Sequence, residues 1–487
     1  MDKVLKCLEP KSVFKYFEEI SQIPRGSGNE KAISDYLVSF ANENKLEVFR
    51  DQYLNVIIKK PAYKGYEDAP TLILQGHMDM VCEKNKHTLH DFQKDPLKLK
   101  IVNDMIYDAD TTLGADNGIA VAMALAVLEA DDIPHPAIEA VITSDEEVSM
   151  SGAMNLDTTP LNGKMLINLD SEEEGYLLVS SAGGTKARLS MPIECETPDI
   201  DMSSYRISIG GLRGGHSGAE IDKGRGNANR LLGRLLNNLS SDFSFRIAEI
   251  NGGLKSNAIT REAEVIIYIN PAQAAKLTEL LKGWNEVFKN ELSATDPDLH
   301  ITIEAIHNIE RKAFTKNMTE RVIAALVMLP NGIQSMNMHI KGLVESSSNL
   351  GVVKTTSTAV ELVNEIRSSV KTLKTSILKQ VELTGKVLGC KLTVDSDYPE
   401  WEYNPDSRLR KHFHSVYTNK YGVEPQIIAL HAGLECGVLS NKIEGLDCIS
   451  LGPNLYDVHT PDEHLSIPST KNVWEYLLEA LKQAKHI

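Results

Sequence analysis

The amino-acid sequence predicts an α/β fold with more than one domain, and three features support this. Short apolar runs alternate with longer stretches rich in alanine and leucine, as expected for buried strands and the helices between them. The length of 487 residues exceeds what a single core usually organises. Side chains that can bind metals follow the apolar runs up to residue 170 and return only at residue 459, which predicts an inserted domain.

Three apolar runs in the first part of the chain are predicted to be buried strands. Each run ends just before one or two side chains of the kind that bind metals. These are the runs 71–76 before His77 and Asp79, 137–143 before Glu146 and Glu147, and 164–169 before Asp170. In open α/β sheets, ligands bind in the crevice beyond the C-terminal ends of the strands. We therefore expect these side chains to lie together at one edge of a sheet.

Asp116 occurs in a different setting. It follows residues 111–115 and opens a helix-like stretch, residues 118–130, that is rich in alanine, leucine and methionine. The N-terminus of a helix carries a partial positive charge that stabilises a carboxylate. We therefore expect Asp116 to be held firmly where this helix begins.

Imidazole and carboxylate groups together favour Zn²⁺, Co²⁺ or Mn²⁺, whereas an all-oxygen set would favour Mg²⁺ or Ca²⁺. Two such ions need a carboxylate that bridges them and terminal ligands for each, and the reaction needs one acid left free as a base. The adjacent Glu146 and Glu147 can divide these roles, because neighbouring residues in a turn point in different directions. Any one of these residues alone is more typical of a protein surface, so the prediction depends on their joint placement.

Six segments resemble the signatures of the M20 metallopeptidase family and, within it, the branch of aminoacyl-histidine dipeptidases (Xaa-His dipeptidase, peptidase D). The segments occur in the order typical of the family, and the resemblance extends from about the first predicted helix to the last. They are residues 76–81, 113–118, 144–147, 214–218, 431–437 and 457–463.

The resemblance implies a zinc-peptidase catalytic domain with a central mixed sheet flanked by helices, plus an inserted α+β lid domain. It also implies a ligand set for two metal ions. His77, Asp116 and Asp170 would hold one ion. Asp116, Glu147 and His459 would hold the other, with Asp116 as the bridge.

The same resemblance implies three catalytic roles. Asp79 would orient the imidazole of His77, a contact that fixes the tautomer of a metal-binding histidine. Glu146 would be the general base. His216 would donate a hydrogen bond to the oxyanion of the tetrahedral intermediate. Composition alone would favour a flexible loop around His216, because glycines flank it, and the resemblance reverses that preference.

Three further residues are expected to bind substrate. Asn257 and Arg367 resemble lid positions that approach the C-terminal carboxylate of a dipeptide, which suits the fork geometry of a guanidinium. The alternative is an asparagine in a turn and a surface arginine after a strand. Glu435 could receive a free amino terminus, and the alternative is a structural turn in a glycine-rich segment.

The reaction implied by the resemblance is hydrolysis of Xaa-His and other unblocked dipeptides through a water that bridges two divalent ions, with zinc expected and Co²⁺ or Mn²⁺ as alternatives. A related M20 hydrolase is the main competing interpretation: a tripeptidase, a carboxypeptidase or an N-acyl amino-acid deacylase. A metal-binding protein without activity is a further alternative, and the presence of Glu146 argues against it.

The expected domains are a catalytic domain in two parts, residues 1–185 and 397–487, and a lid over residues 186–396 that contains two α+β sandwich units. With two units in the lid His216 could act within its own chain; with one, a homodimer partner would supply it. The lid elements expected from the pattern are strands over 204–209, 264–269 and 354–366 and helices over 227–239, 273–288 and 371–388.

The charge and the cysteines limit the partners and the compartment. Acidic residues outnumber basic ones 67 to 51, which argues against nucleic acid or an anionic membrane as partner. Small peptides are the partners that the resemblance implies. The 6 cysteines are scattered, so we expect neither a zinc finger nor a disulfide framework. Neither a basic leader with an apolar run nor a membrane-spanning segment is evident, so we expect a cytoplasmic protein.

Overall fold

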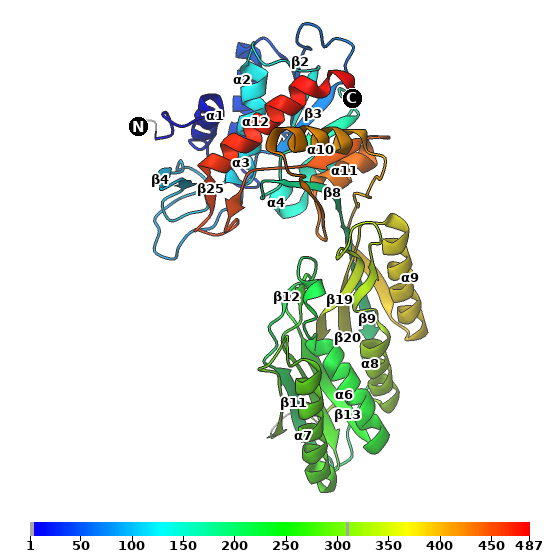
Figure 1. The fold of residues 1–487 in the computed structure, drawn as a ribbon. Coiled ribbons are helices and arrows are strands. Elements are labelled where there is room, and N and C mark those ends of the chain that lie inside the picture. Colours follow the sequence, from blue (N-terminus) through cyan, green and yellow to red (C-terminus); the bar gives the residue numbers. More distant parts are fainter. Residues whose placement is uncertain (1–3, 308–310) are drawn as a thin grey trace. The chain divides into compact units, whose positions relative to one another are not determined.

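A computed structural model describes residues 4–307 and 311–487, and the chain divides into two compact units (Figure 1). Unit 1 comprises residues 1–180, 403–429 and 434–487, and unit 2 comprises residues 181–402 and 430–433. The sequence predicted changes of domain after residues 185 and 396. The brief return of residues 430–433 to unit 2 was not anticipated.

Unit 1 contains an eight-stranded mixed sheet in the order β1-β2-β6-β3-β7-β23-β8-β22. Its central strands β6, β3, β7 and β23 run parallel. The residues of β6, β3 and β7 are all buried, which explains why these three strands lie in apolar runs of the sequence. His77 lies opposite Thr143, and Gln75 lies opposite Asn168. This register brings the C-terminal ends of the three predicted strands to one edge.

The helices of unit 1 pack on this sheet and on each other. The helices are α1 (Lys11–Ile20), α2 (Lys31–Glu43), α3 (Ala115–Glu129), α4 (Glu146–Ser149), α5 (Ser151–Asn155), α10 (Arg408–Tyr421), α11 (Glu435–Lys442) and α12 (Ile467–Gln483). The strands are β1 (Glu47–Arg50), β2 (Val56–Lys60), β3 (Leu72–His77), β4 (Lys100–Val102), β5 (Met105–Tyr107), β6 (Ile138–Thr143), β7 (Met165–Asn168), β8 (Tyr176–Ser181), β22 (Gln426–Leu430), β23 (Asp447–Ser450), β24 (Leu455–Tyr456) and β25 (His464–Ser466). The last two form a small second sheet with β5 and β4.

Helix α3 lies at the centre of unit 1, between α1 and strand β3. It is apolar on all sides and buried along nearly its whole length, as expected for a helix covered from every direction. A side chain at Gly76 would meet the Asn117 Oδ1 atom at 2.5 Å and the Ala120 Cβ atom at 2.7 Å. Gly76 therefore allows the start of α3 to approach the end of β3, which brings Asp116 close to His77.

Unit 2 is an α+β structure with one continuous sheet in the order β16-β11-β15-β13-β19-β20-β9-β21, to which β18 is added beside β19. Among the described residues, two ladder pairs, Asn251 with Lys354 and Gly252 with Val353, join the two four-stranded halves. A single apolar core nevertheless contains residues of both halves. The expected pair of sandwich units stays a prediction.

Helices α6, α7, α8 and α9 pack along the sheet of unit 2 (Figure 1). They span Ala228–Asp242, Ala274–Glu291, Lys316–Met328 and Lys371–Val387. The strands are β9 (Gly183–Pro192), β10 (Cys195–Glu196), β11 (Ser203–Gly210), β12 (Gly215–His216), β13 (Phe245–Gly252), β14 (Ala258–Ile259), β15 (Ala263–Ile269), β16 (His300–Ile306), β17 (Ala313–Phe314), β18 (Gly332–Met336), β19 (Val344–Thr355), β20 (Ala359–Ser368) and β21 (Lys391–Tyr398).

One predicted element of unit 2 was wrong. The strand expected over residues 354–366 is a hairpin, in which β19 ends at Thr355 and β20 begins at Ala359. The turn contains neither glycine nor proline, and it is closed by the Thr356 hydroxyl, which accepts hydrogen bonds from the backbone N–H groups of Thr358 and Ala359. Across the described parts of both units, no helix is long and apolar enough to cross a membrane.

Candidate active site

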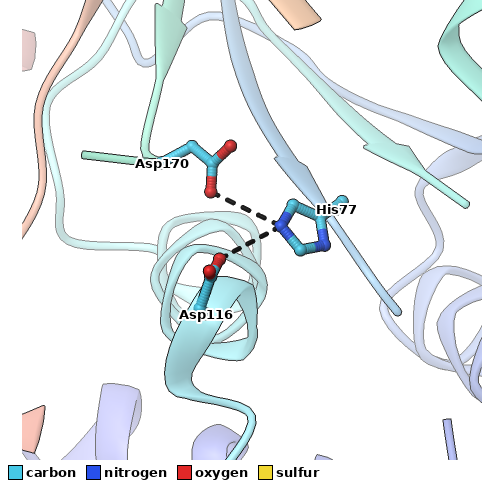
Figure 2. A group of neighbouring side chains, drawn as sticks. All are labelled: His77, Asp116 and Asp170. Atoms are coloured by element: carbon cyan, nitrogen blue, oxygen red, sulfur yellow. Dashed lines mark hydrogen bonds and ion pairs between the residues drawn. The ribbon is translucent and has the colours of Figure 1, made fainter. Parts of the chain in front are cut away.

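His77, at the end of β3, is the centre of the first group of ligand-type side chains in unit 1. Its Nε2 atom lies 3.2 Å from Asp116 Oδ1 and 3.5 Å from Asp170 Oδ1, and Figure 2 shows both carboxylates directed at this one nitrogen. Its Nδ1 atom lies 3.4 Å from Asp79 Oδ1. A carboxylate beside Nδ1 favours the tautomer with the proton there, and this leaves the lone pair of Nε2 free for a metal.

His459 forms the second group, with Asp116 and Glu147. Its Nε2 atom lies 3.2 Å from Asp116 Oδ2 and 3.0 Å from Glu147 Oε2. In each group the ligand atoms all lie within 4.8 Å of one another. Asp116 therefore directs one oxygen to the imidazole of His77 and the other to that of His459, an arrangement suited to a carboxylate that bridges two ions.

Asp79 connects His77 to the turn that carries the paired glutamates. Its Oδ1 atom accepts a hydrogen bond of 3.1 Å from the Glu146 N–H, and its Oδ2 atom accepts one of 3.3 Å from the Glu147 N–H. The Ser27 hydroxyl donates a further bond of 2.8 Å to Oδ2. Asp79 is fully buried, so one carboxylate fixes both the imidazole and the start of α4. The sequence suggested only the first of these contacts.

Glu146 also lies close to the ligand-type atoms. His77, Glu146 and Glu147 form a third group whose ligand atoms lie within 4.8 Å of one another. Proximity alone therefore does not separate a ligand from a base at these two positions. Glu147 has the additional contact to His459, whereas Glu146 has none to that imidazole among the described contacts.

The site contains more buried acid than its histidines can balance. Burial, assisted by neighbouring carboxylates, raises the pKa of Asp170 to about 6 and the pKa of Glu146 well above its usual value. The Glu147 Oε1 atom is buried and has no hydrogen-bond partner. Bound cations would relieve both the repulsion and the unpaired oxygen. The imidazole and carboxylate donors thus fit divalent ions of the zinc type.

Glu463 supports Asp116 and was not given a role by the sequence. It is buried, and its Oε2 atom accepts hydrogen bonds from the N–H groups of Leu113 and Gly114, at 2.9 and 3.0 Å. Its Oε1 atom accepts from Ala115 and Asp116, at 2.8 and 3.3 Å. One carboxylate therefore fixes the whole segment that leads into α3. Its place at the end of segment 457–463, which also contains His459, was the only available signal.

Arg25 was also missed. Its guanidinium is 1% exposed and donates to the backbone carbonyls of Met78 and Asp79, at 3.0 and 3.1 Å, and to that of Gly114. It thus joins the turn after His77 to the segment before Asp116. No motif or spacing marks this arginine in the sequence.

Glu435 begins α11 and is completely buried in unit 1. Its Oε2 atom accepts hydrogen bonds from Gln75 Nε2 at 2.5 Å and from the Thr143 hydroxyl at 2.7 Å, while Oε1 has no partner. Burial raises its pKa to about 7. These contacts attach Glu435 to strands β3 and β6, and its expected role at the amino terminus of a substrate stays a prediction.

Unit 2 brings together two of its three predicted residues, His216 and Arg367, around Gly218. A Cβ atom at Gly218 would lie 3.0 Å from His216 Cε1 and 3.2 Å from Arg367 Nε. Arg367 is 5% exposed; it donates to the Tyr398 hydroxyl at 2.6 Å, and its Nε atom has no partner. The third predicted residue, Asn257, is joined to this group because its carbonyl accepts a hydrogen bond of 2.9 Å from the Ser217 N–H.

The hydrogen bonds of His216 define its tautomer. Its Nδ1 atom accepts from the N–H groups of Gly218 and Ala219, at 3.3 and 3.0 Å. Burial and the charge of Arg367 lower its pKa, so the ring is neutral near pH 7. A neutral ring that accepts at Nδ1 carries its proton on Nε2, which makes Nε2–H a donor.

His431 is a further polar residue of unit 2 that had no predicted role. It is 7% exposed, and its Nε2 atom lies 2.7 Å from the Ser347 hydroxyl oxygen. Burial and the nearby Arg367 lower its pKa to about 3, which keeps the ring neutral. Its place in segment 431–437 was the available signal.

Comparison with known proteins identifies the family. Residues 73–483, most of the chain, match the family described as Peptidase family M20/M25/M40. The chain belongs to this peptidase family. It is 36% identical over 479 residues to the cytosol non-specific dipeptidase of Escherichia coli, an alignment that covers 98% of this chain and 99% of the relative.

Solved structures agree with this assignment. The crystal structure of an aminoacylhistidine dipeptidase from Vibrio alginolyticus has a TM-score of 0.94 and 35% identity, with 99% of this chain and 98% of that chain covered. An aminopeptidase from Bacillus cereus shares the fold, with a TM-score of 0.56 and 16% identity over 98% of this chain and 99% of that chain. The predicted family, the predicted fold class and the prediction of a peptide-bond hydrolase are confirmed.

Proposed function

We propose that the protein is a dinuclear-metal dipeptidase that hydrolyses unblocked dipeptides, Xaa-His among them. The observation that carries this proposal is the pair of ligand groups that share Asp116. The chain is also 36% identical to a cytosol non-specific dipeptidase and 35% identical to an aminoacylhistidine dipeptidase. The names of these relatives favour a dipeptidase over a tripeptidase, a carboxypeptidase or a deacylase.

In this proposal His77, Asp116 and Asp170 hold one ion, and Asp116, Glu147 and His459 hold the other. Zinc is the metal we expect, with Co²⁺ or Mn²⁺ as alternatives. When bound, the two ions would polarise the scissile carbonyl and lower the pKa of a water molecule between them. Glu147 is assigned as a ligand and Glu146 as the base because only Glu147 faces His459.

In this proposal Glu146 is the group that transfers protons. Its carboxylate belongs to the group whose ligand atoms lie within 4.8 Å of one another, which is close enough to exchange protons with a water molecule held there. It would take a proton from the attacking water and deliver it to the leaving amine. The hydrogen bonds that the Asp79 carboxylate accepts from the N–H groups of Glu146 and Glu147 would hold the base in the required place.

Four further residues would contact the substrate in this proposal. His216 would donate its Nε2–H to the developing oxyanion, a role for which its neutral tautomer is suited. Arg367 and Asn257 would receive the C-terminal carboxylate, since the guanidinium retains an unpaired N–H. Glu435, with one free oxygen, would receive the amino terminus.

We further propose a cytoplasmic protein, in agreement with the name of the Escherichia coli relative. Its partners would be small peptides, and its net charge of −16 disfavours nucleic acid. A homodimer is compatible with this proposal, and sedimentation would establish the oligomeric state.

A substrate panel tests the proposed function. The purified protein, loaded with Zn²⁺, Mn²⁺ or Co²⁺, would be offered Xaa-His dipeptides, other dipeptides, tripeptides and N-acyl amino acids. We expect turnover of the free dipeptides and much slower turnover of the N-acylated forms. Faster hydrolysis of tripeptides or of N-acyl amino acids would reject the dipeptidase assignment in favour of a related activity.

A further inference from the structure

Two short segments of unit 2, which contain His216 and Asn257, are joined by backbone hydrogen bonds. Strands β12 and β14 pair so that Gly215 lies opposite Ile259 and His216 lies opposite Ala258. The Ser217 N–H donates to the Asn257 carbonyl at 2.9 Å. Any shift of residues 256–258 is therefore transmitted to the backbone of His216 and Ser217.

The side chain of Asn349 forms hydrogen bonds to the segment that contains Asn257. It lies on β19, is 1% exposed, and belongs to neither segment. Its amide nitrogen donates to the Ser256 carbonyl at 2.9 Å and to the Ala258 carbonyl at 2.8 Å. Both donors of the amide are thus used on the residues directly before and after Asn257.

The orientation of the Asn349 amide is itself fixed. Its Oδ1 atom accepts a hydrogen bond of 3.0 Å from Asn227 Nδ2. Asn227 is the N-cap of α6, and its own Oδ1 atom accepts from the Arg230 N–H at 3.2 Å. Since Asn227 can present only donors to Asn349, the Asn349 nitrogen must face the two carbonyls.

We propose that Asn349 is a positioning residue of the reaction, which places Asn257 directly and His216 through the Ser217–Asn257 hydrogen bond. The proposal rests on the proposed function for the roles of these two residues. Asn349 does not touch substrate in this proposal. Its effect comes from the carbonyls of Ser256 and Ala258, which would otherwise lack these partners and allow the segment to shift.

Asn349→Asp is the informative change because it keeps the shape and places carboxylate oxygens against two carbonyl oxygens. Asn364→Asp is the matched control. Asn364 is 0% exposed and lies on the neighbouring strand β20. Its amide donates to the Pro330 carbonyl and to the Ser348 hydroxyl, both at 3.0 Å. Both variants lose buried hydrogen bonds, but only Asn349→Asp loses those beside Asn257.

We expect Asn349→Asp to lower kcat/KM by roughly 10- to 100-fold with the metal content unchanged, the cost of misplacing groups that act on the substrate. Asn364→Asp should lower Tm with kcat/KM near wild type. In a double-mutant cycle, Asn257→Ala combined with Asn349→Asp should lose less activity than the two single losses together, because the part of the effect that acts through the Asn257 side chain is already gone while the part that acts through His216 remains. Additive losses, or an equal loss in Asn364→Asp, would overturn the proposal.

Hydrogen exchange measured by mass spectrometry tests the same idea without any activity. Asn349→Asp should speed exchange in peptides that cover residues 215–219 and 254–260, and Asn364→Asp should not. Asn349→Ala, which adds no charge, serves if the aspartate variant does not fold. Unchanged exchange in both Asn349 variants would refute the positioning role, whereas an inactive wild-type enzyme with the expected exchange pattern would refute only the dipeptidase assignment.

Discussion

Asp116 illustrates how much of the site depends on single atoms. Its two oxygens lie 3.2 Å from two different imidazole nitrogens, so the residue can serve two ions only if both oxygens stay in place. The paired glutamates pose a different problem, since both lie within reach of His77. Their separate roles follow from the extra contact between Glu147 and His459. The first prediction addresses this difference.

Glu146→Gln should leave two ions per chain and abolish turnover, because the amide cannot accept the proton. Glu147→Gln should lose metal as well as activity, because a ligand is weakened. Metal analysis of both purified variants, together with kcat, makes the comparison. A Glu146→Gln protein that retained most of its kcat, or that lost metal as readily as Glu147→Gln, would show that the two roles are assigned the wrong way round.

His216 yields the second prediction. Removing its Nε2–H donor by His216→Ala should lower kcat by roughly 10²–10³, the usual cost of one oxyanion donor, with the metal content intact. His300→Ala is the control, since His300 is an exposed histidine on β16 of the same unit. Near-normal kcat in His216→Ala would remove this residue from the mechanism.

At the scale of elements, the segment from Leu113 to Asp116 depends on Glu463, far away in the sequence. Glu463→Gln replaces one acceptor oxygen by an NH₂ group, so two of the four N–H donors lose their partner. The bridging carboxylate would then be held less firmly, and we expect metal affinity to fall roughly 10- to 100-fold, as is typical when the support of a ligand is removed. Competition with a chelator measures this change.

Glu139→Gln supplies the control for that experiment. Glu139 is also a buried carboxylate of unit 1, and it accepts hydrogen bonds from the N–H groups of Asn162 and Gly163, away from the ligands. The Glu139→Gln variant should have a lower stability than the wild type and nearly the same metal affinity. Equal losses of affinity in both variants would mean that Glu463 acts only through general stability.

The elements also show what the sequence could and could not predict. Strands β3, β6 and β7 were predictable because each is an apolar run whose end carries a metal-type side chain. The hydrogen bonds of Arg25 and those of Glu463 were not predictable, because they leave no local pattern in the sequence. Arg25 and Met78 are 53 positions apart, and Glu463 and Leu113 are 350 positions apart. The hairpin between β19 and β20 was missed because hydroxyl side chains, rather than glycine or proline, make its turn.

At the scale of the whole molecule, the ligand groups are confined to one unit. Among the described residues, all three lie in unit 1, although their members come from both of its major sequence parts. The predicted insertion explains this, because the chain leaves unit 1 after Ser180 and returns at Tyr403. Residues 430–433 are the exception, and so short a return to unit 2 has no compositional signal.

The fourth prediction concerns metal removal and its dependence on pH. A ligand that binds only the folded state stabilises it, so chelation should lower the Tm of a calorimetric transition assigned to unit 1 and leave that of unit 2 unchanged. The sign of the pH effect follows from the metal-free site. Burial raises the pKa of Asp170 to about 6 and that of Glu463 to about 7. Hydrogen bonds with Asp116 and Glu147 raise the pKa of His459 to about 11.

These shifts share one direction, because in each case the folded protein binds protons more tightly than the unfolded chain. Between about pH 4 and pH 7 the buried acids lose protons that the unfolded chain has already released, and His459 is protonated in the folded state above the ordinary histidine pKa of about 6.5. The metal-free unit 1 should therefore lose stability as pH rises from 5.5 to 8. Metal ions compete with these protons for the same side chains. The metal-loaded unit 1 should therefore gain stability relative to the metal-free unit 1 as pH rises. We expect the difference in Tm between the zinc-loaded and the chelated protein to widen over this range, and a difference that narrows would contradict the assignment of these side chains to a metal site.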